Sequence, residues 1–122
     1  MLVLATGFHV DAFMRPMNIT GRNGIDLDEV WKDWPSAYLS IAVPEFPNFF
    51  MLNGPNSPVG NFSLIQTAEM QFDYVLQIVN HVNQGDLDIA VVSHEAFDRF
   101  DAERYEAANG TVWATGCNSW YL

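Results

Sequence analysis

The chain begins with an uninterrupted apolar run. Residues 1–5 are all hydrophobic and are followed by Thr6-Gly7, a pattern typical of a strand buried on both faces of a parallel sheet and ended by a glycine turn. Such a strand normally follows other strands of the same sheet. We therefore expect that further sequence precedes Met1 in the complete protein.

A hairpin signal follows within residues 18–27. Asn23-Gly24 lies there between two short alternating runs, and both residues tolerate a positive φ, which predicts a small hairpin. Further apolar runs at residues 39–43, 48–52 and 88–92 predict three short strands.

Two segments have helical patterns. Ser63 followed by Gln66 fits a capping box, which predicts a helix from there to residues 83–85. Apolar residues recur along it at helical spacing, so we expect most of this helix to be buried: Ile65, Ala68, Phe72, Val75, Leu76, Val79 and Val82. Ser93 is placed to cap a second, shorter helix that runs through Ala108 and stops at Asn109-Gly110. The alternation of strands and helices predicts an α/β fold.

Composition limits the classes of protein. The chain has 122 residues, of which 49% are hydrophobic, enough for one domain or part of a larger one. No apolar run approaches the ~20 residues of a membrane-spanning helix. Cys117 is the only cysteine and no signal peptide is recognisable, so a cytoplasmic location is expected.

The charge balance excludes two kinds of partner. Five basic residues stand against 15 acidic ones, for a net charge of -10. The chain has no Lys/Arg cluster, so nucleic acid and anionic membranes are not expected as partners. A solvated acidic surface that keeps the protein soluble is the simpler explanation of the charge.

The candidate for binding chemistry is the loop rich in Asn, Gly and Pro between residues 53 and 61. It leads from a predicted strand into the start of the long helix, where free N–H groups and the helix dipole attract negative charge. No basic residue lies between Lys32 and Arg99, so binding there would use backbone N–H groups and Asn or Ser side chains. That suits a polar or weakly anionic ring, although an ordinary connecting loop has the same pattern.

Other chemistry has little support. The three histidines, His9, His81 and His94, lack the spacing of a metal site, and no metal is expected. No nucleophile elbow, P-loop or paired catalytic carboxylate motif occurs, so the residues alone identify no catalytic group.

Four blocks of the sequence resemble the flavin-containing monooxygenases and the related Baeyer-Villiger monooxygenases. They occur in the order expected for that family: Leu2-Val3-Leu4-Ala5-Thr6-Gly7-Phe8; Phe46-Pro47-Asn48-Phe49-Phe50-Met51-Leu52-Asn53-Gly54-Pro55-Asn56; Ser63-Leu64-Ile65 with Glu69-Met70-Gln71 and Tyr74; and Gly116-Cys117-Asn118-Ser119-Trp120-Tyr121-Leu122. The blocks extend over nearly the whole chain.

The resemblance implies a place within a larger flavoprotein. Residues 1–122 would be the C-terminal part of an enzyme with two Rossmann-like dinucleotide-binding domains, for FAD and NAD(P), and would hold an incomplete sheet. Both glycine-rich dinucleotide fingerprints are absent from the chain. The implied divisions are a return strand at 1–8, a connector with the hairpin at 9–43, a flavin-facing strand-loop-helix at 44–83 and a C-terminal αβ extension at 84–122.

The resemblance also implies the cofactor-binding residues. Thr6 and Gly7 would lie at the crossover between the NADPH and FAD domains. The loop beside the flavin would consist of Asn53, Gly54, Pro55 and Asn56. Four residues just before the long helix would direct its start at the pyrimidine edge of the flavin ring: Gly60, Asn61, Phe62 and Ser63.

The implied reaction is oxygenation with FAD and NADPH as cofactors. NADPH reduces FAD, O2 adds to form a C4a-peroxyflavin, and one oxygen atom is inserted into a ketone, a small organic substrate. The signature FxGxxxHxxxW, which helps to distinguish Baeyer-Villiger enzymes, is absent, so oxygenation of an amine or sulfide is the alternative. A non-catalytic acidic interaction module is a further alternative. As a fragment, the chain is expected to be inactive alone and to need the remainder of the FAD and NADPH domains as its partner.

Overall fold

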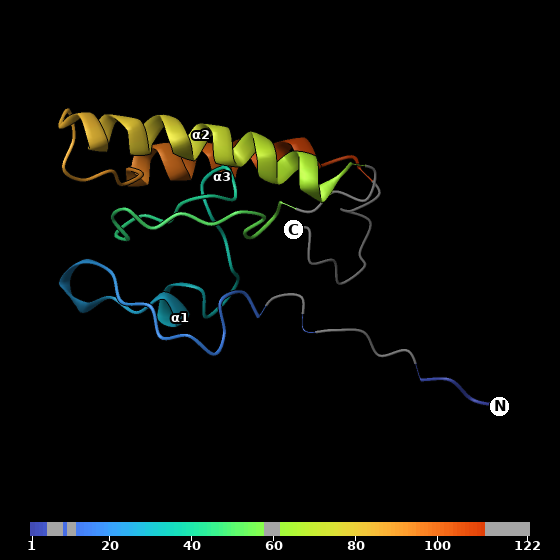
Figure 1. Ribbon diagram of the computed structural model, residues 1–122. Coiled ribbons are helices and arrows are strands. Elements are labelled where there is room, and N and C mark those ends of the chain that lie inside the picture. Colours follow the sequence, from blue (N-terminus) through green and yellow to red (C-terminus); the bar gives the residue numbers. More distant parts are fainter. Residues whose placement is uncertain (5–8, 10–11, 58–61, 112–122) are drawn as a thin grey trace.

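The computed structural model describes residues 1–4, 9, 12–57 and 62–111. Its elements, in chain order, are a short 3-10 turn η1 (Arg22–Gly24) and the helices α1 (Leu27–Val30), α2 (Leu64–Gln84) and α3 (His94–Ala108). Figure 1 shows α2 and α3 along one side, irregular chain beneath them, and the segment that carries α1 on the far side. Within the described residues no helix combines the length and apolarity needed to cross a membrane.

The ends of α2 lie where the sequence predicts them. The Ser63 hydroxyl accepts a hydrogen bond from the Gln66 N–H and caps the helix. Gly85 ends it with a φ of 80°, a left-handed conformation that glycine adopts without the cost of a Cβ. The prediction of a helix from Ser63 to residues 83–85 is confirmed.

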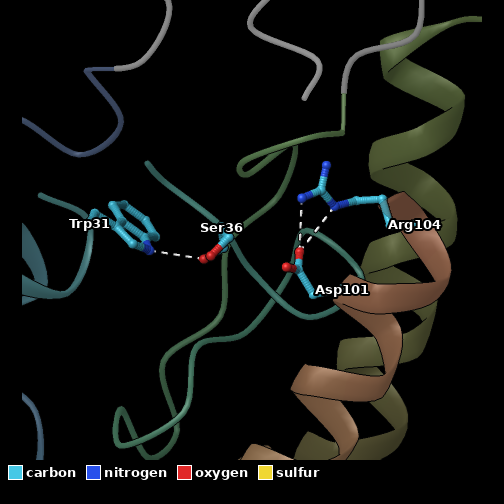
Figure 2. Close-up of polar contacts among 4 residues, drawn as sticks. All are labelled: Trp31, Ser36, Asp101 and Arg104. Carbon is cyan, nitrogen blue, oxygen red and sulfur yellow. Dashed lines mark hydrogen bonds and ion pairs between the residues drawn. The ribbon is translucent and has the colours of Figure 1, made fainter. Parts of the chain in front are cut away.

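The shorter helix α3 is also confirmed. The Ser93 hydroxyl accepts from the Ala96 N–H at its start, and Asn109 forms its C-cap. An ion pair within α3 joins Arg104 Nη2 to Asp101 Oδ1 at 2.8 Å (Figure 2). Both predicted helices therefore form from local capping signals.

The turn within residues 18–27 forms with little strand around it. Asn23 and Gly24 have φ values of 56° and 79°, as the Asn-Gly pair predicts. An isolated antiparallel bridge joins Thr20 to Asp26, and the turn between them is the 3-10 turn η1. The hairpin is thus reduced to one bridge and a turn.

The strand predicted at residues 39–43 is wrong. Leu39 and Ser40 both have positive φ values, of 50° and 59°, and form a tight turn closed by the bridge between Tyr38 and Ala42. A left-handed conformation is unusual for a leucine. The apolar run does not form an extended strand because the chain reverses direction within it.

The strands predicted at residues 48–52 and 88–92 are also absent. Asn48 connects the two segments instead: its N–H donates to the Ala90 carbonyl at 2.8 Å, and its side-chain oxygen accepts from the Ala90 N–H at 2.9 Å. One asparagine thus makes the contacts that a pair of strands would share. A pair of strands needs a continuous series of backbone hydrogen bonds between them, and no such series forms among the described residues.

The first predicted strand is not formed in the part that the structure describes. Residues 1–4 are irregular and exposed, because no neighbouring segment of the described chain pairs with them. The rest of that run, like the resembling block at 116–122, lies outside the described residues.

The hydrophobic core lies between α1 and Met51. Its buried members are Leu27, Trp31, Ala37, Val43, Phe46 and Met51. The Trp31 ring N–H donates to the Ser36 carbonyl at 2.9 Å, so its one polar group is satisfied (Figure 2). The expectation that most of α2 would be buried is wrong, because Gln71 is its one buried residue.

Candidate functional site

Gln71 of α2 connects three segments of the candidate site. Its Oε1 accepts from the Asn53 N–H at 2.7 Å. Its Nε2 donates to the Leu39 carbonyl and to the Ser57 hydroxyl, both at 3.3 Å. The side chain is buried, where a polar group needs such partners. Gln71 therefore fixes the loop of residues 53–57 and the turn at Leu39 against α2.

The loop of residues 53–57 lies close to the turn at residues 39–40. The Gly54 N–H donates to the Ser40 carbonyl at 3.2 Å. A Cβ added at Gly54 would lie 2.5 Å from that same oxygen, so this position accepts no side chain without a backbone shift. Pro55 is fully buried. The loop is therefore held from both sides by contacts that the sequence of the loop does not show.

Asn56 has a buried amide without a partner. Its Nδ2 and Oδ1 are shielded from solvent, and neither has a hydrogen-bond partner within the part of the chain that the structure describes. Its φ is 65°, a left-handed conformation that asparagine tolerates better than most residues. An unsatisfied buried amide costs about 1–3 kcal/mol. Asn56 is thus the residue of this loop with unused capacity to bind a polar group.

The start of α2 adjoins this loop. The Asn53 side-chain Nδ2 donates to the Leu64 carbonyl at 3.3 Å, which joins the loop to the first helical residue. Ser63 takes up the N–H groups of Gln66 and Thr67 through its hydroxyl and carbonyl oxygens. No acceptor for the amides of Leu64 and Ile65, two of the N–H groups that the first turn of a helix leaves without an intrahelical partner, occurs among the described contacts.

The structure thus describes six of the predicted site residues and unites them. Asn53, Gly54, Pro55 and Asn56 form one loop, and Phe62 and Ser63 lead into α2 beside it. The remaining four predicted residues lie outside the described residues: Thr6, Gly7, Gly60 and Asn61.

Sequence reasoning missed the role of Gln71. A signal for it exists, because Gln71 lies at helical spacing from Ala68 and Val75 and so interrupts the inner apolar face of α2 with a polar side chain. A polar residue at such a position is typical of a buried hydrogen-bonding group.

A separate apolar cavity of about 270 Å³ lies between residues 38–50, α2 and the start of α3. Tyr38 and Tyr74 line it together with several phenylalanines, and none of the predicted site residues does. Burial, and secondly the nearby Tyr38, raise the pKa of the Tyr74 phenol above its ordinary 10.0. Neither tyrosine contacts the loop of residues 53–57 through a hydrogen bond among the described contacts. No group of three metal-ligating side chains occurs in the described part of the chain.

No model of a known protein family matches the chain. Individual proteins do match over essentially all of it. An uncharacterized monooxygenase of Mycobacterium tuberculosis is 47% identical over the whole chain, which corresponds to 25% of that relative. The FAD-binding monooxygenase tazF of Aspergillus terreus is 36% identical over 99% of the chain, which corresponds to 21% of the relative.

Solved structures with similar folds come from the same kind of enzyme. A cyclohexanone monooxygenase variant from Rhodococcus sp. Phi1, bound to NADP+, matches 93% of this chain with 31% identity and a TM-score of 0.81, over 22% of its own length. A steroid monooxygenase bound to NADP matches 86% of this chain with 30% identity and a TM-score of 0.75, over 20% of its length.

The chain thus spans about a quarter of the length of the mycobacterial relative and about a fifth of the length of the Aspergillus relative. The similar structures are two-domain flavin monooxygenases, and this chain corresponds to about a fifth of their length. The resemblance to the flavin-containing and Baeyer-Villiger monooxygenases is confirmed: the homologues of this chain are monooxygenases, FAD-binding ones among them, and its structural neighbours are Baeyer-Villiger enzymes.

Proposed function

We propose that the chain forms the flavin-facing part of an FAD- and NADPH-dependent monooxygenase that inserts one oxygen atom from O2 into a ketone. The observation that carries this proposal is the similarity to FAD-binding monooxygenases along 99% of the chain. One similar structure holds cyclohexanone, a ketone, and others hold NADP. These neighbours favour a ketone over an amine or sulfide as substrate.

The residues of the loop fit a flavin. The unsatisfied amide of Asn56 offers both a donor and an acceptor. The pyrimidine edge of a flavin ring alternates carbonyl acceptors with an N–H donor, which is the complement of such an amide. A ring that reached the Asn56 amide, which is shielded from solvent in this structure, would remove the cost of leaving it buried without a partner.

The start of α2 fits the charge that this ring acquires. Bound FAD supplies electron storage and oxygen activation, and its reduced ring carries negative charge near N1 and the C2 carbonyl. The amides of Leu64 and Ile65, which have no acceptor among the described contacts, would stabilise negative charge held there, together with the dipole of a helix capped by Ser63. No Lys or Arg occurs between Lys32 and Arg99, so backbone groups would supply this stabilisation.

The other expected roles complete the proposal. Thr6 and Gly7 would lie where the chain passes between the NADPH and FAD domains, and Gly60 and Asn61 would extend the loop toward the ring. The division into return strand, connector, flavin-facing segment and C-terminal extension is part of the same proposal. Because the chain spans a quarter of its mycobacterial relative, it would act together with the rest of both cofactor domains and would be inactive alone.

A hybrid protein tests this function. The chain replaces the aligned segment of the Mycobacterium tuberculosis relative, and FAD content is measured by flavin absorbance after gel filtration. The hybrid is expected to retain FAD at the level of the unaltered relative. Asn56→Leu, which fills the same space without hydrogen-bonding groups, is expected to reduce FAD retention several-fold. Leu52→Asn, at an exposed neighbouring position, is the control and should leave it unchanged.

The reaction is then followed with NADPH and O2. Oxygenated products from a set of cyclic ketones, amines and sulfides are identified by mass spectrometry. Ester or lactone products from ketones are expected. If only amines or sulfides are oxygenated, the ketone is not the substrate and this part of the proposal is refuted. A hybrid that folds without retaining FAD would refute the placement of this chain beside the flavin.

A further inference from the structure

The cavity between residues 38–50, α2 and the start of α3 takes no part in the proposed function. None of the residues expected to bind a cofactor lines it. Its volume of about 270 Å³ is slightly below the roughly 300–1,000 Å³ of pockets that hold drug-sized molecules, and most gaps in a well-packed interior are no larger than a water molecule. The cavity therefore has room for one small molecule.

Aromatic side chains form much of the cavity wall: Tyr38, Phe46, Phe49, Phe50 and Tyr74. Packing against neighbours fixes the orientation of some of these rings. Phe46 and Phe49 lie with their ring centroids 6.2 Å apart and their planes at 55°, and the Tyr38 ring meets Phe100 of α3 edge-on at 5.4 Å. Aromatic rings prefer such tilted and edge-on neighbours, so an aromatic ring is the occupant that this wall favours.

Two phenol hydroxyls supply hydrogen-bonding groups to the cavity. Tyr38 is partly buried and Tyr74 is 40% exposed, and neither hydroxyl has a hydrogen-bond partner among the described contacts. The raised pKa of Tyr74, caused by burial and by the nearby Tyr38, keeps its phenol protonated. Each phenol can donate one hydrogen bond and accept others. A hydroxyl of an occupant can therefore accept from one phenol and donate to the other.

The rest of the cavity wall is uncharged. Ile41, Ile78 and Val92 are among the aliphatic residues that line it, and no charged side chain does so within the described residues. A charged occupant would lose its hydration there and gain no opposite charge in return. The wall therefore favours a neutral molecule.

We propose that this cavity binds a small neutral aromatic molecule with one hydroxyl group, a simple phenol. Its ring packs against Phe46 and Phe49, and its hydroxyl bonds those of Tyr38 and Tyr74. The proposal goes beyond the proposed function and does not depend on it, since the cavity shares no residue with the loop of residues 53–57.

Titration with phenol tests this site directly. The tyrosine rings of the chain are labelled with ¹³C, and their signals are followed by NMR as phenol is added. The signals of Tyr38 and Tyr74 are expected to shift and to saturate. Tyr105, which is 46% exposed on α3 and lies against Arg104, is the internal control and should not shift. Shifts that never saturate, or that are equal at Tyr105, would overturn the proposal.

Matched ligands and variants test the two parts of the site. Toluene has a methyl group in place of the hydroxyl of phenol and is expected to bind several-fold more weakly. Tyr38→Phe and Tyr74→Phe, which each remove one oxygen atom and also assign the signals, should weaken phenol several-fold and leave toluene unchanged. Equal binding of phenol and toluene would refute the role of the two hydroxyls and with it the proposal.

Filling the cavity supplies a steric test. Ala96 lines the cavity at the start of α3, and Ala96→Leu is expected to weaken phenol binding at least about tenfold. Ala102→Leu makes the same change at an exposed position of the same helix and should leave binding unchanged. Circular dichroism of both variants checks that α2 and α3 remain folded. Unchanged binding to Ala96→Leu would place phenol outside the cavity and contradict the proposal.

The same titration in the hybrid separates this inference from the proposed function. It is performed without NADPH, and the signals of Tyr38 and Tyr74 are those that disappear in the two phenylalanine variants. Saturable shifts in a hybrid that holds no FAD would support the cavity site and refute the proposed function. FAD retention without these shifts would show that the longer polypeptide closes the cavity, and would overturn this inference alone.

Discussion

Replacing Gln71 by leucine tests whether one side chain positions the candidate site. The substitution removes the acceptor of the Asn53 N–H at 2.7 Å and the donor to the Leu39 carbonyl and the Ser57 hydroxyl, both at 3.3 Å. Leaving the Asn53 N–H unsatisfied costs about 1–3 kcal/mol, and each longer bond contributes about 0.5 kcal/mol. The added apolar burial of leucine returns about 1 kcal/mol. We therefore expect a net loss of about 2 kcal/mol.

This loss is measurable because small domains are stable by only about 5–15 kcal/mol. Urea unfolding of the chain is followed by tryptophan fluorescence, since Trp31 is buried in the core. Gln77→Leu is the matched control: it makes the same change on the same helix, where the side chain is exposed and, among the described contacts, bonds only to the Asp73 carbonyl. The control is expected to change stability by less than about 0.5 kcal/mol.

A local measurement distinguishes the mechanism from a general loss of stability. Hydrogen exchange at the Asn53 amide should accelerate in Gln71→Leu more than exchange within α3 does. Gln71→Glu keeps an acceptor for that amide and loses the two donated bonds, so it should preserve protection at Asn53. Equal stability of Gln71→Leu and Gln77→Leu, or unchanged exchange at Asn53, would refute the role given to Gln71.

Three further predictions concern the same region. Gly54→Ala is expected to cost about 1–3 kcal/mol in urea unfolding, because the added Cβ would lie 2.5 Å from the Ser40 carbonyl oxygen; an unchanged midpoint would contradict that close approach. Ser63→Ala removes the N-cap of α2 and should lower stability by about 1 kcal/mol, with a loss of helical circular dichroism; equal stability would count against the cap. Since the pKa of Tyr74 is raised above 10.0 in the folded chain, its contribution to stability is complete below pH 10.0 and is lost as the pH rises through the raised pKa; Tyr74→Phe should weaken this alkaline loss, and identical pH profiles would disprove the link.

The helices were predictable because their signals are local. Ser63 and Ser93 cap their helices through N–H groups three residues ahead, and Gly85 ends α2 in a left-handed conformation. Each of these contacts lies within one turn of the residue that causes it. A sequence pattern a few residues long therefore contains the whole interaction.

The predicted strands failed because strand pairing is not local. An apolar run such as residues 39–43 is compatible with a strand or with a turn whose flanks are buried. Leu39 and Ser40 adopt left-handed conformations and form the turn. The side-chain amide of Gln71 donates a hydrogen bond to the Leu39 carbonyl, and these two residues are 32 positions apart in the sequence. Asn48 similarly contacts Ala90 across 42 positions.

The candidate site was predicted in part for the same reason. The composition of residues 53–56 indicates a loop beside a helix start, and the structure unites these residues with Ser63 through the contact of Asn53 with Leu64. What holds the loop, however, comes from Gln71 and the Ser40 carbonyl. Neither partner is visible from within the loop.

Gln71 also links the candidate site to the rest of α2. Its side chain bonds the loop at Asn53 and Ser57 and belongs to that helix. Because Gln71 fixes the position of the loop, Gln71→Leu should lower FAD retention in the hybrid even though Gln71 is not proposed to touch the flavin.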